Sequence, residues 1–223
     1  MGSKNKLKRF RENATFANVV QPQRETVLHK AFPLQGQWAA QHFRNEQPIV
    51  LELGCGKGEY TVHLASQQPQ QNFIGVDIKG ARFWRGAKTA SEKGYANVAF
   101  LRTQIELIDL CFAKNEVSEI WITFPDPQLK FKRAKHRLTH PSFLERYQRI
   151  LKPGGVVHLK TDSSFLWGYT LGVLEKLPAH VLYAHHDIYH NADAPKTATS
   201  VQTFYEQQFL DMGKPIAYLQ FQF

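Results

Sequence analysis

From residue 49 onward the chain alternates short apolar runs with segments of helical periodicity. An apolar run bounded by glycine, proline or polar residues is typical of a strand that is covered on both faces. The expected strands are Ile49–Leu53, Phe73–Val76, Val98–Arg102, Glu119–Phe124, Val156–Lys160, Val181–Asp187 and Ile216–Phe223. The expected helices between them are Glu59–Ser66, Ala81–Lys93, Pro141–Leu151 and Phe165–Leu177. This alternation predicts an α/β fold with a mostly parallel seven-stranded sheet flanked by helices.

The first expected strand runs into a glycine-rich turn that carries an acid. Residues 51–58 read Leu-Glu-Leu-Gly-Cys-Gly-Lys-Gly, with Glu52 just ahead of the alternating glycines Gly54 and Gly56. This spacing predicts a tight corner between strand and helix whose backbone is open to a ligand. The next strand leads into Asp77, and a carboxylate at that place suits the hydroxyls of a ribose. Together the two elements indicate a nucleoside cofactor.

The glycine spacing argues against a dinucleotide as that cofactor. A dinucleotide fingerprint needs a third small residue at position 59, where this chain has Glu59, and a glutamate there would repel a pyrophosphate. With Glu52, two acids flank the turn, which suits a cationic ligand. S-adenosylmethionine carries a sulfonium, an amino group and a ribose, so it is the cofactor that we expect. The alternative is an ordinary corner whose glycines serve packing alone.

A rigid acidic turn followed by a basic loop forms a second group of candidate residues. The turn reads Phe124-Pro125-Asp126-Pro127, and prolines fix the backbone on both sides of the acid. The loop that follows contains Lys130, Lys132, Arg133, Lys135 and Arg137. An acid held beside a phosphate-binding loop is what a base-modifying site needs. A plain rigid turn beside a solvated basic face is the alternative.

The net charge points to a polyanionic partner. The 223 residues carry 28 Lys and Arg against 19 Asp and Glu, a formal charge of +9, and nucleic acid is the usual partner of such a chain. Residues 1–13 are basic without an apolar period, so we expect a flexible tail there, ahead of a single domain over residues 14–223. Ala192–Gln202 is polar and contains Pro195, which predicts a mobile loop.

Cysteine content, hydropathy and histidine placement indicate the cellular setting and the absence of membrane and metal partners that we expect. Cys55 and Cys111 are too few for a disulfide framework, which favours a reducing, cytoplasmic setting. No apolar run reaches the length of a membrane span, so we expect no membrane partner. His185, His186 and His190 lie close in sequence, but their strand-to-loop context does not keep them on one face, and we expect no metal site.

Taken in order, these motifs resemble those of the bacterial-type tRNA (guanine-N7)-methyltransferases, which depend on S-adenosylmethionine. The glycine corner with Asp77 is generic to enzymes that use this cofactor. The Pro-Asp-Pro turn with its basic loop and the late segment Thr203-Phe204-Tyr205-Glu206 are much more specific. The segments Phe143-Leu144, Leu151–Gly155 and Lys160-Thr161-Asp162 match between them. The resemblance covers the chain from about Ile49 to the C-terminus.

The resemblance implies a Rossmann-like methyltransferase fold and a role for each matching residue. Glu52, Gly54, Gly56 and Asp77 would hold the cofactor, with Glu52 near its methionine end and Asp77 on its ribose. Asp126 would be the catalytic residue and would touch both cofactor and guanine. The residues implied in substrate binding are Lys130, Asp162, Thr203, Phe204, Tyr205 and Glu206. The partner would be tRNA, modified in its variable loop by a monomer or a homodimer.

Departures from the family pattern leave alternatives open. Gln104 stands where the family usually has an aspartate that contacts the adenine, and its amide can still hydrogen-bond an amino group of the cofactor. After the acidic turn the chain has residues 128–131, Gln-Leu-Lys-Phe, where the family usually has tryptophan, proline and paired lysines. Two alternatives therefore stay open: another S-adenosylmethionine-dependent RNA or protein methyltransferase, and a tRNA-binding relative without catalysis.

Overall fold

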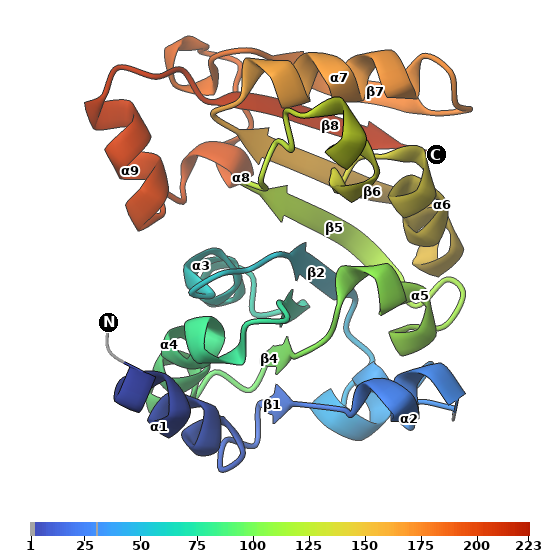
Figure 1. Ribbon diagram of the computed structural model, residues 1–223, viewed down its shortest axis with the longest axis vertical. Helices are drawn as coiled ribbons and strands as arrows, with labels where there is room; N and C mark the ends of the chain where they lie inside the picture. Colours follow the sequence, from blue (N-terminus) through green and yellow to red (C-terminus); the bar gives the residue numbers. More distant parts are fainter. Residues whose placement is uncertain (1–2, 30) are drawn as a thin grey trace.

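The computed structural model describes residues 3–29 and 31–223, which form an 8-stranded sheet covered by helices (Figure 1). The strands are β1 (Val19–Val20), β2 (Ile49–Leu53), β3 (Asn72–Val76), β4 (Val98–Leu101), β5 (Val117–Thr123), β6 (Leu151–Thr161), β7 (His180–His185) and β8 (Ala217–Gln222). The α-helices are α1 (Ser3–Asn13), α2 (Arg24–His29), α3 (Glu59–Gln67), α4 (Gly80–Glu92), α5 (Ile108–Cys111), α6 (Pro141–Ile150), α7 (Ser164–Leu174), α8 (Lys196–Thr199) and α9 (Phe204–Asp211). Short 3-10 or π turns are η1 (Trp38–Phe43), η2 (Ile105–Leu107), η3 (Phe131–His136) and η4 (Ile188–His190).

The strands lie in the order β1-β4-β3-β2-β5-β6-β8-β7, and only the two pairs that involve β8 are antiparallel within the described chain. This topology confirms the predicted Rossmann-like α/β fold with a mostly parallel sheet. The predicted count of seven strands was one too low, because Val19–Val20 pairs with Phe100 and Leu101 at the sheet edge. A run of two residues carries no periodicity, so nothing in the sequence signals this strand.

Hydrophobic side chains on the two faces of the sheet form two cores. The consecutive residues Val50 and Leu51 of β2 point into opposite cores, as the period of a strand requires. On one face Leu51 packs with residues of η1, α5, α6 and α7. On the other face Val50 packs with residues of α3, α4, α8 and α9. Figure 1 shows α3, α4 and α9 on one side of the sheet and α5 and α6 on the other.

Residues Ser3–Asn13 form helix α1, which the sequence pattern did not predict, while residues 1–2 lie outside the described chain. The helix packs against α4 (Figure 1). The buried Asn13 side chain donates a hydrogen bond to the first carbonyl of α4 at 2.8 Å. Trp84 Nε1, also on α4, donates to the Glu12 carboxylate at 2.9 Å. The helix is therefore ordered by tertiary contacts that its own polar sequence does not reveal.

The segment Ala192–Gln202 contains helix α8 and buried side chains, so the prediction of a mobile loop is corrected. Ala198 and Val201 are buried in the core that includes α3 and α4. These isolated apolar residues sit among polar ones and form no period, which is why the sequence pattern missed them. The segment is a packed part of the molecule that leads into α9.

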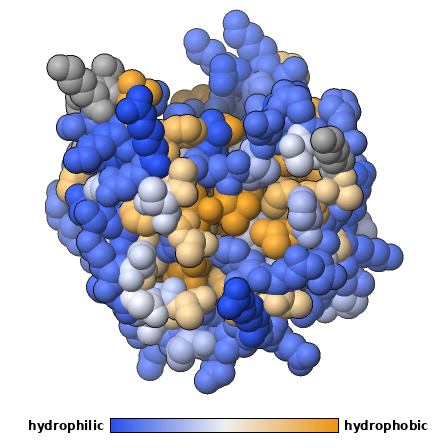
Figure 2. Space-filling view, turned by 90° about the horizontal axis from the view of Figure 1, so that it is seen from below, coloured by the Kyte–Doolittle hydropathy of each residue, from blue (hydrophilic) through white to orange (hydrophobic). Residues whose placement is uncertain are grey.

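The end of the molecule that carries α1, β1 and α2 is seen in Figure 2. Hydrophobic residues gather at the centre of this face, within a largely hydrophilic surround. The edge strand β1 spans only two residues, and an edge this short limits pairing with another chain. Among the helices that the structure describes, none combines the length and the apolar character needed to cross a membrane.

The strand order reverses between β2 and β5, and this reversal positions the site. From β2 the chain proceeds outward to β3 and β4, then crosses to β5 and continues to β6 on the other side. The loops that leave two such strands diverge and leave room for a ligand at the carboxyl end of the sheet. β2 ends at Leu53 and β5 at Thr123, so the glycine corner and the Pro-Asp-Pro turn emerge side by side.

Candidate active site

The glycine corner is held by the neighbouring strand. The amides of Gly54 and Cys55 donate to the carbonyl of Val76, at 2.8 and 3.1 Å, which bends the chain sharply after β2. Gly58 precedes α3 with a φ of 73°, and a Cβ at this position would lie 2.5 Å from the Phe100 ring. The positive φ and the lack of space both require glycine here. The predicted turn from strand to helix is confirmed.

Glu52 is buried at the end of β2 and accepts hydrogen bonds from two threonines. Thr61 donates through its amide at 2.8 Å and through its hydroxyl, and the hydroxyl of Thr123 donates at 2.7 Å from the end of β5. Burial raises the pKa of Glu52 to about 7, while these hydrogen bonds act in the opposite direction. A nearby positive charge would favour the ionised form, so Glu52 is suited to a cationic ligand.

Asp77 follows β3 and is oriented by the backbone around it. Its carboxylate accepts the Gly56 amide at 3.1 Å through Oδ2 and the Lys79 amide at 2.7 Å through Oδ1. Because each carboxylate oxygen can accept two hydrogen bonds, one acceptor position stays open on each. Two adjacent acceptors of this kind match the two hydroxyls of a ribose.

A cavity of about 120 Å³ lies beside this corner and brings distant parts of the sequence together. It is lined by Glu52, Gly54, Cys55, Gly56, Lys57, Glu59, Tyr60, Arg82, Thr123, Phe124, Thr203 and Tyr205. The lining combines residues predicted to hold the cofactor, such as Glu52, with residues predicted to hold the substrate, namely Thr203 and Tyr205. The two predicted halves of the site therefore share one cavity.

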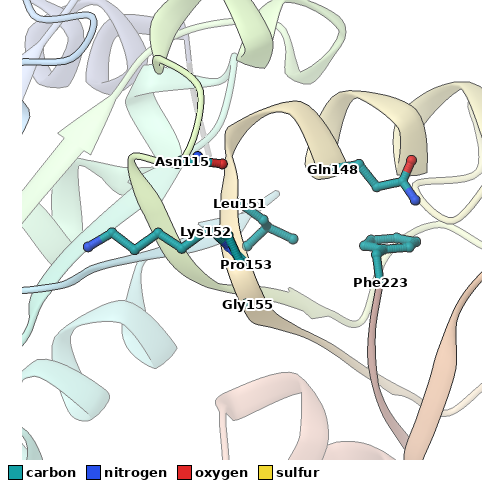
Figure 3. A pocket seen from close by; sticks show the side chains of 7 residues that line it. All are labelled: Asn115, Gln148, Leu151, Lys152, Pro153, Gly155 and Phe223. Carbon is teal, nitrogen blue, oxygen red and sulfur yellow. The ribbon is translucent and has the colours of Figure 1, made fainter.

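A larger cavity of about 280 Å³ lies elsewhere, where β6 begins (Figure 3). Its lining is Asn115, Gln148, Leu151, Lys152, Pro153, Gly155 and Phe223. In Figure 3, Gln148 of α6 lies on the same side as Phe223. The glycine corner lies at the other end of the sheet, where the parallel strands end. Because this larger cavity has no acidic lining residue among those described, it does not offer the chemistry of the glycine corner.

Helix α9 begins beside the glycine corner and is tied to it. The amide of Phe204 donates to the carboxylate of Glu59 at 3.1 Å. The ammonium of Lys57 lies 4.3 Å from the centroid of the Phe204 ring and 5.2 Å from that of Tyr205. Both aromatic side chains remain exposed, by 55% and 50%, so they can still meet a further ligand. Glu59 and Lys57 thus connect the corner to the predicted substrate residues.

Glu206 is fully buried, and its carboxylate is engaged by protein groups. It pairs with Lys160 Nζ at 2.6 Å and accepts the Tyr189 hydroxyl at 2.7 Å. In a capping box at the start of α9, it accepts the Thr203 amide at 3.4 Å while the Thr203 hydroxyl accepts the Glu206 amide. In this conformation the carboxylate of Glu206 is engaged by Lys160, Tyr189 and Thr203, and its contact with guanine stays a prediction.

Asp126 is exposed in the turn that follows β5, and its Oδ1 accepts the Gln128 amide at 3.0 Å. The flanking residues Phe124 and Gln128 have φ values of 47° and 46°, which are uncommon for residues other than glycine. Arg137 supports the turn by donating to the Gln128 carbonyl at 3.1 Å. Thr123 and Phe124 line the cavity and Asp126 does not, so the turn leads from the cavity wall to this exposed carboxylate two residues further on.

Seven predicted residues do not line this cavity. Four of them, Asp77, Asp126, Phe204 and Glu206, bond to lining residues or follow them closely in sequence, and the other three are Gln104, Lys130 and Asp162. Gln104 accepts a hydrogen bond from Arg24 at 3.1 Å. Lys130 is exposed just before η3, and Asp162, which follows β6, lies 3.6 Å from Lys214 Nζ. The structure thus joins the glycine corner to Thr203 and Tyr205, and it leaves these three side chains beyond that cavity.

The sequence pattern did not single out several residues that organise the site. Thr61 and Thr123 orient Glu52, but a threonine in a helix or at a strand end has no distinctive signal. Lys160 is completely buried in β6 and pairs with Glu206. A lysine within the apolar run of residues 156–161 is a signal that could have marked it, because buried lysines are rare without a partner.

Metal ligands do not gather in the part of the chain that the structure describes, where no group of three or more His, Cys, Asp or Glu is placed to hold an ion. His190 Nδ1 lies 2.8 Å from Asp187, and the His185 and His186 rings stack on each other.

Known methyltransferases match this chain over most of its length. The family described as putative methyltransferase matches residues 46–219. A tRNA (guanine-N(7)-)-methyltransferase of Christiangramia forsetii is 64% identical over 221 residues, which cover 99% of this chain and 99% of that protein. The chain belongs to the tRNA (guanine-N7)-methyltransferase family. A protein of the same name from Bacteroides thetaiotaomicron is 48% identical over 98% of this chain and 85% of that protein. Both relatives agree with the resemblance that the motifs indicated.

Solved structures show that the fold of this family member is that of other methyltransferases. The 16S rRNA methyltransferase KamB superposes with a TM-score of 0.63 at 14% identity, over 83% of this chain and 93% of that chain. A 30S ribosomal A1408 methyltransferase from an uncultured bacterium superposes with a TM-score of 0.55 at 16% identity, over 81% and 89%. These likenesses confirm the Rossmann-like methyltransferase fold.

Proposed function

We propose that the protein transfers a methyl group from S-adenosylmethionine to N7 of a guanine in tRNA. One observation carries the proposal: a buried acid at a glycine corner lines the same cavity as Thr203 and Tyr205, in a chain whose relatives are named for this reaction. The family resemblance adds the variable loop as the target region. We further propose a cytoplasmic enzyme that acts as a monomer or a homodimer.

The residues around the corner fit this cofactor. Glu52 Oε1 accepts only the Thr123 hydroxyl among the described contacts, so it keeps an acceptor position for the cationic amino group. Asp77 offers its two open acceptor positions to the ribose, and the amides of Gly54 and Gly56 are already directed by Val76 and Asp77. When bound there, S-adenosylmethionine supplies a methyl group on a positively charged sulfur. A pyrophosphate would meet the negative charge of Glu59 instead.

The acceptor atom asks little of the protein beyond positioning. Guanine N7 carries a lone pair in the neutral base, so no proton has to be removed and no covalent nucleophile is needed. Alignment of donor and acceptor can supply most of the rate enhancement, with effective molarities of about 10⁵ M or more. A carboxylate near the purine stabilises the positive charge that develops on it, and Asp126, at the rim of the cavity, is the residue for this task.

The surface beyond Asp126 suits RNA. The Phe131 side chain is 92% exposed in the basic loop, and Lys130, Lys132 and Arg133 are exposed beside it, while Arg137 is buried beneath the turn. Exposed aromatic and guanidinium planes can stack on bases, and the lysines and arginines of the loop can neutralise phosphates. A guanine inside folded RNA must be unstacked to expose its reactive face to the cavity, which such stacking partners facilitate.

The test is methyl transfer to an unmodified tRNA transcript with labelled S-adenosylmethionine. We expect label in the RNA and a single alkali-labile guanine, as N7-methylguanosine requires. A transcript made with 7-deazaguanosine has carbon in place of N7 and should accept no label. Label on that transcript, or label at a different atom, would replace this proposal with another methyltransferase activity. Cofactor binding without transfer to any tRNA would favour a binding protein that lacks catalysis.

A further inference from the structure

We propose that Lys160 is a positioning residue that fixes the C-terminal arm over the cavity. Glu206 contributes by pairing with Lys160 and not by contacting the base. The C-terminal arm is the segment 196–211, which comprises α8, its connection and α9. The consequence for catalysis rests on the proposed function, because the arm brings Thr203 and Tyr205 to the cavity where the guanine would bind. The structural part of the inference concerns the free protein alone.

A single ammonium group gathers three parts of the arm. Lys160 Nζ pairs with Glu206 of α9 at 2.6 Å, donates to the carbonyl of Val201 at 3.1 Å and donates to the carbonyl of Ala198 in α8. The hydroxyl of Tyr189 lies 3.3 Å from the same nitrogen and donates to Glu206 at 2.7 Å. Every hydrogen-bond or ion-pair partner of Lys160 Nζ except Tyr189 belongs to the arm, so the position of the arm depends on this nitrogen.

The backbone of Lys160 reaches the other half of the site. Its carbonyl accepts the amide of Phe124 at 2.8 Å, at the start of the turn that carries Asp126. The Phe124 ring in turn lies 5.9 Å, between centroids, from that of Phe209 on α9. Lys160 therefore contacts both the acidic turn and the arm, and it sets their relative position from within β6.

The pair has no exposed surface, which makes each partner depend on the other. Burial lowers the pKa of Lys160, and the charge of Glu206 acts in the opposite direction. Removing one member of such a pair leaves a buried charge without compensation, whereas replacing both by apolar residues of similar volume is often neutral. Comparison of the single and double substitutions therefore distinguishes a positioning role of the pair from a direct contact of Glu206 with the base.

Four variants test the inference. Lys160→Met and Glu206→Gln each break the ion pair, and the double variant Lys160→Met/Glu206→Met replaces it by apolar side chains. Tyr189→Phe is a milder change that removes only one hydroxyl from Glu206. Tyr183→Phe is the matched control, because its hydroxyl accepts from Asn191 at 2.7 Å and is not bonded to the Lys160–Glu206 pair.

Hydrogen exchange of the free protein measures how firmly the arm is held, and steady-state kinetics measure the effect of the arm on methyl transfer to tRNA. In both single variants we expect the amides of the arm to exchange about tenfold faster or more, and the KM for tRNA to rise about tenfold, while the Kd for S-adenosylmethionine changes by less than about threefold. Tyr189→Phe should show smaller changes in the same direction. In the double variant we expect exchange and KM to lie between those of the single variants and the parent protein, because no buried charge is left unpaired but the carbonyls of Ala198 and Val201 still lose their donor.

Two results would overturn the inference. One is a Lys160→Met or Tyr189→Phe protein in which both the hydrogen-exchange rates of the arm amides and the KM for tRNA equal those of the parent protein. The other is a double variant with a protected arm and no methyl transfer, since that result makes Glu206 a direct contact of the guanine. A parent protein that methylates no tRNA would refute the proposed function alone, because the exchange measurements on the free protein still decide whether Lys160 fixes the arm.

Discussion

Glu52 should make cofactor affinity depend on pH. Its folded-state pKa is raised by burial to about 7. A group with this pKa is about one tenth ionised at pH 6 and about nine tenths ionised at pH 8. Because the carboxylate is the form that attracts a cationic amino group, the apparent affinity for S-adenosylmethionine should rise about tenfold between these pH values. The pH dependence arises from the buried acid and not from the exposed ones.

The stability of the free protein should change in the opposite direction. A carboxyl group whose folded pKa is raised binds protons more tightly in the folded state than in the unfolded one, where the value is 4.5. Its contribution is therefore fully present below pH 4.5 and is lost as the pH rises through about 7. The shift corresponds to about 3 kcal/mol of unfolding free energy. Bound cofactor should recover part of this loss at pH 8.

The assay is calorimetric titration with S-adenosylmethionine at pH 6, 7 and 8, repeated in buffers of different ionisation enthalpy so that proton release is counted. The Glu52→Gln variant should bind S-adenosylmethionine weakly at every pH, and its affinity should not change with pH. Any pH dependence that remains in this variant comes from titration of the ligand itself and can be subtracted. Glu59→Gln is the matched control, because it removes a more exposed acid from the same cavity and should keep the slope. An equal slope in the parent protein and in Glu52→Gln would refute the assignment.

Three further substitutions test the packing and the docking surface. Asn13→Ala removes a buried hydrogen bond to α4 and should lower the unfolding free energy by about 1–3 kcal/mol in denaturant melts; an unchanged midpoint would show that the helix contributes nothing. Gly58→Ala places a Cβ 2.5 Å from Phe100 and should cost more than about 2 kcal/mol, so a fully stable variant would contradict the packing argument. Phe131→Ala should leave the melting temperature unchanged but weaken tRNA binding by about 1–3 kcal/mol in filter-binding assays, and equal affinity would remove this ring from the interface.

The sheet and the glycine corner could be predicted because their determinants are local. Apolar runs between turn signals specify buried strands, and the glycines at 54–58 occupy backbone positions that other residues resist. The acids Glu52 and Asp77 follow directly from these elements, since each stands at the end of a strand. A pattern of period and turn residues is enough to place such features at the rim of a parallel sheet.

The partners of these residues could not be predicted, because they come from distant segments. The order of α1 depends on contacts of Asn13 and Glu12 with α4, which no periodicity reports. The burial of Glu206 depends on Lys160, and a motif that names Glu206 as a base-binding residue does not say what else its carboxylate meets. Sequence patterns therefore predicted the glycine corner and its acids, but they did not predict the contacts that these residues make.

Glu52 and Asp126 differ in environment, and this difference divides their tasks. Glu52 is buried beside Asp77, whose negative charge adds to the effect of burial on the Glu52 pKa. A third acid in the same interior would make ionisation of Glu52 harder still. Asp126 is instead exposed at the rim, where solvent screens it from the interior charges. Screening also weakens its effect on a developing cation, so Asp126 should stabilise the methylated purine fully only after tRNA has displaced the water around it. RNA binding is therefore expected to contribute to kcat as well as to KM.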